Sequence, residues 1–252
     1  MSGTPADYWS TLPLGRSVGL LVRDANGLAA FNKPAGVLSH PNEPKEEPRA
    51  LLTCRYDQAA QCFIWKTPAG TEGRLWLLNR LDAATSGVIL VAVNEKLAVA
   101  IREQFAKKQV KKIYAAVVFG KPLQEVQLWQ DLLAVQKQGG RVRTAARGNI
   151  PATTEVRLIR NRQAAFHTSL VQLEPHTGRS HQLRVQCAKR HLPIVGDQTY
   201  GNFGLNRQFA KTTGTKRLFL HSLETAFTYT LGGKKFAFQA HAPLPVEFEA
   251  VY

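Results

Sequence analysis

The segment Asn79-Arg-Leu-Asp-Ala-Ala-Thr-Ser-Gly87 separates two apolar stretches, residues 75–78 and 88–93, and carries a carboxylate between them. A carboxylate is costly in apolar surroundings unless another group pairs with it. Taken alone, Arg80 and Asp82 are compatible with an ordinary salt bridge in a loop that ends in a turn. The alternative is that Asp82 takes part in chemistry, and residues elsewhere in the chain decide between the two interpretations.

Apolar runs separated by turn residues indicate secondary structure around this segment. Residues 88–93 are apolar and rich in β-branched side chains, which predicts a buried strand. Asn94 can cap the helix that follows, in which Leu97, Ile101 and Phe105 form the apolar face. Further elements are expected as a helix at about residues 180–190 and as strands at residues 110–119, 155–159, 165–173, 218–221, 224–231 and 235–240.

These elements predict an α+β fold with a mostly antiparallel mixed sheet flanked by a few helices and loops. We expect one domain over residues 18–252, preceded by an N-terminal arm of residues 1–17. No apolar run approaches the roughly 18 residues that a membrane span needs. The first residues also lack the basic start and long apolar centre of a secretion signal. The sequence therefore predicts a cytoplasmic protein that is not inserted in a membrane.

The charge of the chain favours a polyanionic partner. Its 33 Lys and Arg residues exceed its 18 Asp and Glu residues, which gives a net charge of +15 and an isoelectric point near 10.0. A field of this sign raises the local concentration of polyanions, and Lys and Arg contacts to phosphates release counterions. Nucleic acid is thus the leading partner, with an anionic membrane surface or mere solubility as the alternatives.

The sequence shows no pattern typical of a metal or nucleotide cofactor. Cys54, Cys62 and Cys187 are odd in number and scattered, and no C-x-x-C pair suggests zinc. We expect them to be small buried apolar residues. A P-loop and a dinucleotide fingerprint are absent as well, so neither a metal nor a cofactor is predicted.

Two other polar segments are suited to binding anions. Glu174-Pro-His-Thr-Gly-Arg-Ser-His-Gln-Leu-Arg184 places three basic side chains around a turn and a helix start, where unpaired amides and arginine donors can bind phosphate or carboxylate. In Lys111-Lys-Ile-Tyr114, basic residues flank an aromatic that can stack on a base. Alternatively, the first segment is a capped surface helix, and the tyrosine of the second is a half-buried core residue.

Taken together, these segments resemble the motifs of the RluA-type family of RNA pseudouridine synthases. The segment R-L-D-x-x-T-S-G at residues 80–87 is similar to the motif around that family's catalytic aspartate. The resemblance continues in the family's order through residues 33–36, 111–114, 176–184, 193–197, 200–201 and 242–245. It covers nearly the whole chain from about residue 28 and implies the pseudouridine synthase fold and an isomerase that acts on RNA.

The resemblance also implies roles for individual residues. Asp82 would be the essential carboxylate, Tyr114 would stack on the target base, and Arg184 would pair with Asp82. Arg80 would fill the space that the flipped uridine leaves in the RNA, and Leu183 would line the floor of the pocket. Weaker candidates for RNA contact or positioning are Lys112, Arg179 and His181.

The chemistry of the family agrees with these residue types. Pseudouridine is uridine detached from its ring nitrogen and rejoined through a ring carbon, so no atoms are gained or lost. The nucleotide must leave the RNA stack, at a cost of about a few kcal/mol. Asp82 can attack the anomeric carbon, assist loss of the base or remove a sugar proton, and the sequence leaves these routes open. A cation such as Arg184 would keep it ionised, since it lowers a carboxylate pKa by roughly 1–3 units.

The chain departs from the family's pattern in two motifs and at its N-terminus. Asn79 and Gln186 stand where histidines are usual, which affects RNA contacts or target choice and not the core chemistry. Many relatives carry a basic N-terminal RNA-binding module, whereas only 32 residues precede Lys33 here. We therefore expect the catalytic domain itself to recognise RNA, through the basic residues Lys137, Arg141, Arg143 and Arg147.

Two other functions are alternatives to this one. A non-catalytic RNA-binding protein would not need Asp82, Tyr114 and Arg184 together. A glycosidase with paired carboxylates needs a second acid near Asp82, and the next one along the chain, Glu95, is poorly placed at a helix start. The expected partner is ribosomal or transfer RNA, bound by a monomer, with the target uridine left open.

Overall fold

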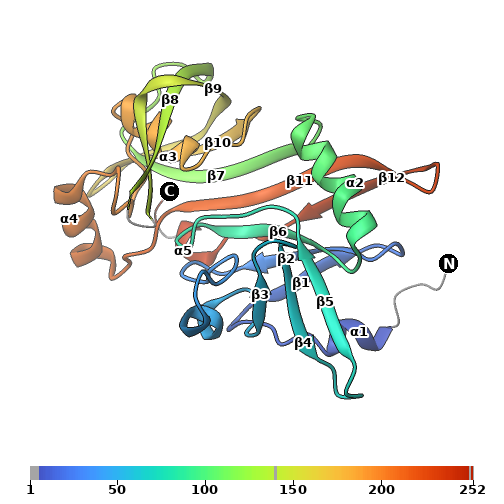
Figure 1. Ribbon diagram of the computed structural model, residues 1–252. Coiled ribbons are helices and arrows are strands. Elements are labelled where there is room, and N and C mark those ends of the chain that lie inside the picture. Colours follow the sequence, from blue (N-terminus) through green and yellow to red (C-terminus); the bar gives the residue numbers. More distant parts are fainter. Residues whose placement is uncertain (1–5, 139–140, 250, 252) are drawn as a thin grey trace. The chain divides into compact units, whose positions relative to one another are not determined.

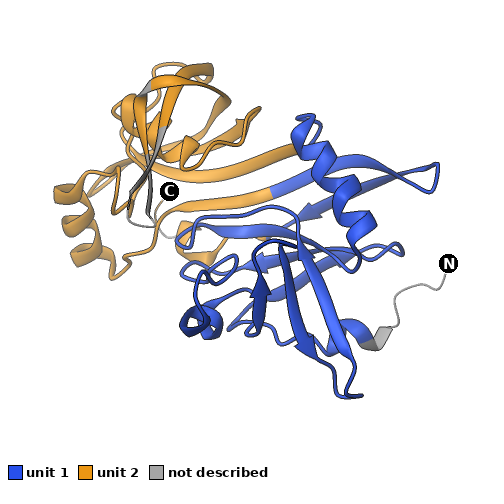
Figure 2. Cartoon of the chain, in the orientation of Figure 1, with its two compact units in different colours: residues 1–110, 224–242 blue, residues 111–223, 243–252 orange. Residues whose placement is uncertain are grey.

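The computed structural model describes residues 6–138, 141–249 and 251. The chain divides into two compact units (Figure 2). Unit 1 consists of residues 1–110 and 224–242, and unit 2 consists of residues 111–223 and 243–252. Each unit has its own buried core.

Unit 1 is built on antiparallel strands (Figure 1). They are β1 (Gly19–Arg23), β2 (Leu28–Lys33), β3 (Arg55–Asp57), β4 (Cys62–Lys66), β5 (Glu72–Leu77), β6 (Ser86–Ala92) and β12 (Lys234–His241), together with residues 224–231 of β11 (Leu220–Leu231). Strand β6 is buried along its whole length and pairs with both β2 and β5, as its apolar, β-branched sequence predicts. The β11–β12 hairpin turns at Gly232 and Gly233, whose φ angles of 57° and 78° suit a type I′ turn.

The main helix of unit 1 is α2 (Glu95–Ala106). Its N-terminus is capped by Asn94, whose Oδ1 accepts a hydrogen bond from the Leu97 amide at 2.9 Å. The buried residues Leu97, Ala98 and Ile101 belong to the core of unit 1. Two short helices complete the unit, α1 (Ala6–Ser10) and the 3-10 helix η1 (Pro44–Arg49).

The described part of the N-terminal arm packs on unit 1. The ring of Tyr8 contacts the ring of Trp65 edge-on, with centroids 5.6 Å apart. The Gly15 amide donates to the Leu51 carbonyl at 2.8 Å. A Cβ at Gly15 would lie 2.1 Å from the Ala50 oxygen, so only glycine fits this close approach of two backbones. The expectation of one domain over residues 18–252 stays a prediction.

Unit 2 contains a second set of antiparallel strands, hydrogen-bonded in the order β7-β10-β9-β8. They are β7 (Lys111–Phe119), β8 (Val126–Gln138), β9 (Arg141–Gln163) and β10 (His167–Pro175). The helices are α3 (Gln182–Lys189), α4 (Phe203–Thr213) and α5 (Val246–Glu249). Aromatic rings in mutual contact fill part of its core, namely Phe119, Phe166, Phe209, Phe219 and Phe248.

Most predicted elements are confirmed, but the sequence pattern divided some strands too finely. The strand at 88–93, the helix after Asn94, the strand at 110–119 and the helix near 180–190 are present as β6, α2, β7 and α3. The strands expected at 218–221 and 224–231 are one strand, β11. The strand expected at 155–159 is part of the 23-residue β9, and its partner β8 was not predicted.

Helix α4 was missed because Gly204 and Asn206 are poor helix formers. The sequence signals for α4 were the residues at its two ends. The Asn202 side chain accepts from the Leu205 amide at 3.0 Å, and Gly214 closes the helix with φ 74°. Among the described residues, none of the helices has the length and apolar character needed to cross a membrane.

Candidate active site

The loop that carries Asp82 is fixed to unit 1 through its backbone. The Leu81 amide donates to Ser39 Oγ at 2.9 Å, and the Ser39 hydroxyl donates back to the Leu81 carbonyl at 2.7 Å. On the other side, the Thr85 amide donates to the Asp82 carbonyl at 3.0 Å and closes a turn. Ser39 and Thr85 are both buried. Asp82, half-buried itself, therefore occupies a turn held on both sides.

A buried lysine ties the same loop to residues 33–37. Lys33 is fully buried, and its Nζ donates to the carbonyls of Pro34 at 3.0 Å, Val37 at 2.7 Å and Ala83 at 3.1 Å. The Gly36 amide donates to the same Ala83 oxygen at 2.7 Å. A buried ammonium is costly unless its three donors have acceptors. Lys33 and Ala83, which are 50 residues apart in sequence, thus join residues 33–37 to the loop that carries Asp82.

The other residues of the 79–87 segment have different surroundings. Arg80 is exposed. The Asn79 Oδ1 accepts from the Leu90 amide at 2.7 Å, so the residue that stands in the usual histidine position anchors the loop to β6. Sequence reasoning identified this segment but not Ser39 or Lys33 as its supports.

In unit 2, Arg184 forms a buried bidentate ion pair with Asp197. Its Nε donates to Oδ2 and its Nη2 donates to Oδ1, both at 2.8 Å. The amides of Thr199 and Tyr200 also donate to Oδ1, at 2.8 and 3.0 Å. Burial by itself would raise the pKa of Asp197, but the Arg184 guanidinium and these amides outweigh it and hold the pKa below its usual value. Asp197 is therefore an ionised carboxylate that orients Arg184.

Tyr200 links Arg184 to His181. The guanidinium of Arg184 lies over the Tyr200 ring, 5.1 Å from its centroid. The Tyr200 hydroxyl lies 2.8 Å from His181 Nδ1 and accepts from the Thr144 amide at 2.9 Å. His181 stands at the start of α3 with φ 53°, an uncommon conformation for a residue with a side chain. These contacts fix the first turn of α3.

Strand β7 carries Lys112 and Tyr114, both half-buried. Tyr114 is paired with Leu173 of β10 in the strand register. Burial lowers the pKa of Lys112, and a Cβ on Gly178 would lie 3.8 Å from its Nζ. Lys112 thus lies beside the loop that leads into α3, and its role in RNA contact or positioning stays a prediction.

The remaining predicted residues of unit 2 differ in exposure. Arg179 is exposed, and its amide donates to Gln182 Oε1 at 3.1 Å. Leu183 is buried in the core of unit 2. Gln186, at a position where histidine is usual, is fully buried and donates to Asp131 Oδ2 at 2.8 Å. Gln186 therefore supports the interior of unit 2 rather than its surface.

The structure brings the predicted residues together in two groups, one in each unit. Asp82 and Arg80 share the loop of unit 1, and Tyr114, Lys112, Arg179, His181, Leu183 and Arg184 lie in unit 2. The pairing of Arg184 with Asp82 stays a prediction. A guanidinium has five N–H donors, so a pair with Asp197 leaves that prediction open. Asp197 and Tyr200 lie in recognised motifs, but sequence reasoning had assigned them no role.

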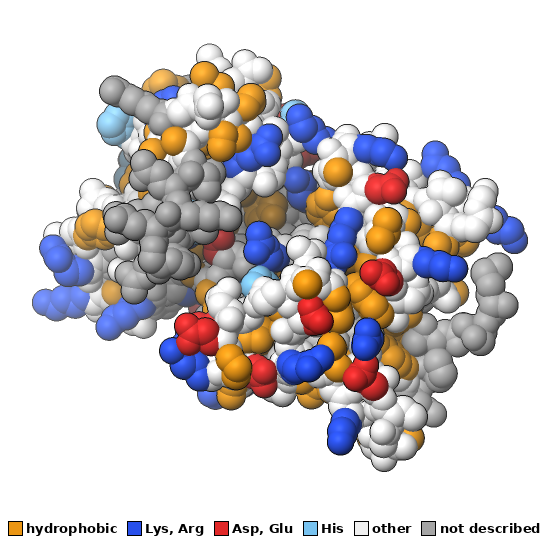
Figure 3. Space-filling view, viewed as in Figure 1, with side chains coloured by type: hydrophobic (Ala, Val, Ile, Leu, Met, Phe, Trp, Pro, Cys, Tyr) orange, Lys and Arg blue, Asp and Glu red, His pale blue; other side chains and the backbone are white. Residues whose placement is uncertain are grey.

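The basic residues expected to bind RNA lie at the β8–β9 ribbon. Lys137 belongs to β8, and Arg141, Arg143 and Arg147 belong to β9. Their side chains, like residues 139–140, lie outside the part that the structure describes. Elsewhere, Lys and Arg side chains are scattered over the face of each unit that Figure 3 shows. Within residues 6–138, 141–249 and 251, no group of three or more His, Cys, Asp or Glu side chains could hold a metal ion.

Comparison with known proteins gives a consistent result. The family model described as RNA pseudouridylate synthase matches residues 27–189. The chain is 33% identical over 220 residues to tRNA pseudouridine synthase C of Haemophilus ducreyi (strain 35000HP / ATCC 700724), covering 83% of this chain and 85% of that protein. It is 31% identical over 229 residues to the protein of the same name in Pectobacterium carotovorum subsp. carotovorum, covering 86% of this chain but only 57% of that relative's length.

Solved structures show the same fold. Human RNA Pseudouridylate Synthase Domain Containing 1 superposes with a TM-score of 0.68 at 22% identity, covering 93% of this chain and 87% of that chain. Human RNA Pseudouridylate Synthase Domain Containing 4 superposes with a TM-score of 0.62 at 22% identity, covering 92% and 90%. At this identity the likeness concerns the fold alone, and it confirms the predicted α+β class.

Proposed function

The chain belongs to the RNA pseudouridylate synthase family and with it to the isomerases that form pseudouridine in RNA; we propose that its substrate is a transfer RNA and that Asp82 is its catalytic carboxylate. The choice of transfer RNA over ribosomal RNA is supported by the relatives named tRNA pseudouridine synthase C, which are 30–34% identical to this chain.

The single observation that carries the assignment of Asp82 is the support of its turn from both sides. Lys33, Ser39 and the turn hydrogen bond of Thr85 hold the backbone while the side chain is half-buried. A catalytic group that is positioned before the substrate binds needs no reorganisation during the reaction. Such support is more than an ordinary surface salt bridge between Arg80 and Asp82 would need.

The reaction needs an ionised carboxylate near the ribose of an extruded nucleotide. The glycosidic bond from C1′ to the ring nitrogen breaks, the base turns, and a bond from C1′ to a ring carbon forms. That carbon loses a proton and the nitrogen gains one, so atoms and electrons balance. Asp82 acts at the sugar, and Tyr114 stacks on the uracil while it turns.

In this proposal Arg184 pairs with Asp82, and Asp197 holds Arg184 in place. The two hydrogen bonds of 2.8 Å between Arg184 and Asp197 support a fixed guanidinium. Arg80 enters the space that the uridine leaves, Leu183 lines the pocket, and Lys112, Arg179 and His181 contact or position the RNA. The enzyme acts as a monomer in the cytoplasm. It uses no nucleotide cofactor, because the isomerisation balances by itself.

The test of the carboxylate is conversion of uridine in transfer RNA by Asp82→Asn. We expect the rate to fall by at least about 10²–10⁴-fold, the range for loss of a catalytic acid or base, while folding and RNA affinity stay near wild type. Glu43→Gln, which removes an exposed carboxylate of the same unit, is the control and should be fully active. A fully active Asp82→Asn enzyme contradicts the assignment.

The test of the substrate is a map of pseudouridine across total cellular RNA with and without the gene. We expect a pseudouridine to disappear from one or more transfer RNAs and to return with the wild-type gene only. Loss of a ribosomal pseudouridine instead would refute the choice of transfer RNA while leaving the activity intact.

A further inference from the structure

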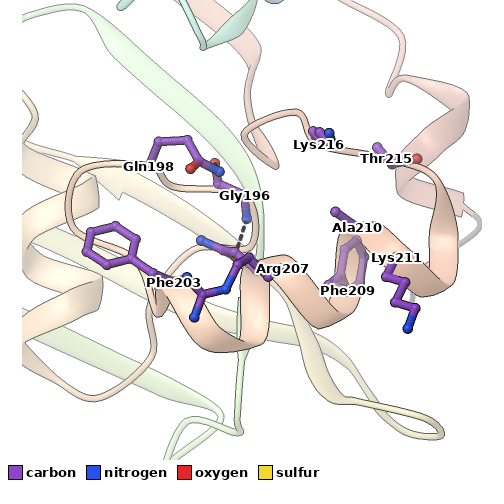
Figure 4. A pocket seen from close by; sticks show the side chains of 10 residues that line it. Gly196, Gln198, Phe203, Arg207, Phe209, Ala210, Lys211, Thr215 and Lys216 are labelled. Carbon is purple, nitrogen blue, oxygen red and sulfur yellow. Dashed lines mark hydrogen bonds between the residues drawn. The ribbon is translucent and has the colours of Figure 1, made fainter.

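Helix α4 of unit 2 forms one wall of an open groove of about 690 Å³. The opposite wall consists of two loops, one around residues 196–198 and one around residues 215–216 (Figure 4). The residues that line the groove include Gln198, Phe203, Arg207, Lys211, Thr215 and Lys216. We call this feature the α4 groove; it contains none of the residues assigned above to catalysis.

The α4 groove is strongly cationic. No Asp or Glu occurs between Gln198 and Leu223, whereas Arg207, Lys211 and Lys216 are all exposed. Within the described part of the chain, no acidic side chain forms an ion pair with any of these three. Basic side chains also stand out around α4, at the left of Figure 3. Their charges are therefore available to an external polyanion.

An exposed aromatic ring accompanies these cations. Phe203, the first residue of α4, is 53% exposed although it is a large apolar side chain. Single exposed apolar residues are common, but here the ring lines the same groove as the three cations. Proteins bind unpaired nucleotides with this combination: cations contact the phosphates of the nucleic-acid backbone, and a neighbouring ring stacks on a base. RNA uses both features, because its phosphates bind the cations and its bases stack on the ring.

Hydrogen bonds and a close backbone approach hold the wall of the groove at Gly196 against α4. Buried Asn206 accepts from the Gly196 amide at 2.8 Å and donates to the Asp197 carbonyl at 2.9 Å. Gly196 has φ 77°, and a Cβ there would lie 1.7 Å from the Arg217 oxygen, so the backbones touch where only glycine fits. A preformed surface of this kind binds with little loss of conformational entropy.

This wall leads directly into the residues that orient Arg184. Asp197 follows Gly196 in the chain, and its carboxylate makes the bidentate pair with Arg184. The α4 groove and the Arg184 pair are thus two sides of one loop within unit 2. A strand of RNA seated in the groove would lie against the loop that holds Arg184.

We propose that the α4 groove binds the substrate RNA outside the target uridine, with Arg207, Lys211 and Lys216 on backbone phosphates and Phe203 stacked on an unpaired base. This inference rests on the proposed function, because it takes the substrate to be RNA. It adds a surface separate from the β8–β9 residues expected from the sequence.

The charge component is tested with Arg207→Gln, Lys211→Gln and Lys216→Gln combined in the full-length protein. The control combines Lys66→Gln, Lys96→Gln and Lys235→Gln, which removes three exposed cations of unit 1 and gives the same net charge. Binding of a transfer RNA transcript is measured as a function of salt. We expect the groove variant to bind at least about tenfold more weakly than the control, and its slope of log K against log salt to be smaller by about 2–3. Equal affinities and slopes would overturn the proposal and leave an acidic protein as the partner to examine.

The stacking component is tested with Phe203→Leu and Phe203→Tyr. Loss of stacking should weaken RNA binding by about fivefold or more without changing the salt slope, and tyrosine should restore it. If leucine and tyrosine bind equally well, Phe203 does not stack on a base.

Separate measurements of RNA binding, KM and kcat distinguish this proposal from the proposed function. If the groove binds RNA, the triple variant should raise KM and leave kcat near the wild-type value at saturating RNA, because the Asp82 loop is unchanged. Binding is measured without turnover, so it tests the groove even if the wild-type protein fails to convert uridine in that transfer RNA. A fall in kcat with an unchanged KM would contradict a binding role.

Discussion

Asp82 and Arg184 are the two charged residues on which the proposed chemistry depends, and the protein holds them in different ways. The turn of Asp82 is supported through main-chain atoms, by Lys33 and Ser39 from a distant segment. Arg184 is oriented through its side chain, by the carboxylate of Asp197. The first arrangement fixes the main chain of the Asp82 loop, whereas the second fixes a guanidinium in one orientation. The two supports should therefore differ in what their loss costs.

The largest effect is expected for Asp197→Ala. This change leaves Arg184 buried without the carboxylate that orients it, and removal of one partner of a buried ion pair typically costs about 3–5 kcal/mol. The free energy of unfolding, measured by urea denaturation, should fall by this amount, and activity should fall as well. Exposed Glu43→Gln is the matched change and should be neutral. A loss below about 1 kcal/mol would show that Arg184 is held mainly by other contacts.

Lys33→Met is expected to have the second largest effect, because methionine fills a similar volume without donors. The carbonyls of Pro34, Val37 and Ala83 would each lose a charged donor. The Ala83 carbonyl keeps its bond from the Gly36 amide. Each unsatisfied buried acceptor costs about 1–3 kcal/mol, so we expect a loss of about 2–4 kcal/mol from the other two carbonyls. Urea denaturation measures the stability. The single-turnover rate shows whether Asp82 is still positioned for the reaction. Exposed Lys66→Met is the control, and an unchanged single-turnover rate would argue against support of Asp82 by Lys33.

Ser39→Ala should have a smaller effect on the same loop. It removes two neutral hydrogen bonds to Leu81 but leaves the Lys33 contacts in place. We expect a loss of about 1–2 kcal/mol and a modest decrease in turnover. Ser39→Thr, which keeps the hydroxyl, should recover part of the loss. If Ser39→Ala lowers the stability more than Lys33→Met does, Ser39 and not Lys33 is the stronger support of the loop.

The smallest effect concerns acid. The pKa of Asp197 is held below its usual value in the folded chain. A carboxyl of this kind contributes stability above its unfolded pKa of about 3.9, and the contribution is lost as the pH falls through the folded pKa. The free energy of unfolding of the wild type should therefore decline as the pH is lowered below about 4, and the decline should be smaller in Asp197→Asn. Parallel curves for the two proteins would contradict the shift.

Local elements with a clear period were predictable from the sequence. The β-branched run of β6 and the helix capped by Asn94 have strong local signals, and both are present as expected. Helix α4 has weak propensity and depends on its caps, so tertiary packing of Phe209 decides it. The long strands β8 and β9 were missed or divided because a strand is stabilised by its partner, which a local pattern does not contain.

The site shows the same division between local and long-range information. The motifs around Asp82 and Arg184 were identified, and the family they resemble is confirmed by the match over residues 27–189. The supports were not identified, because Ser39 and Leu81 are 42 residues apart and Arg184 and Asp197 are 13 apart. Nothing in the local sequence pairs these residues, although Asp197, an acid next to an apolar run, was a usable signal.

The order of residues along the chain determined the family, the α+β class and the identity of the charged groups, because these depend on composition and on motifs that short segments carry. Only the tertiary structure decided that a fully buried lysine holds the Asp82 loop, that an aspartate holds Arg184, and that three cations and an exposed ring share one groove. Those arrangements arise because a buried charge must find partners wherever the folded chain brings them.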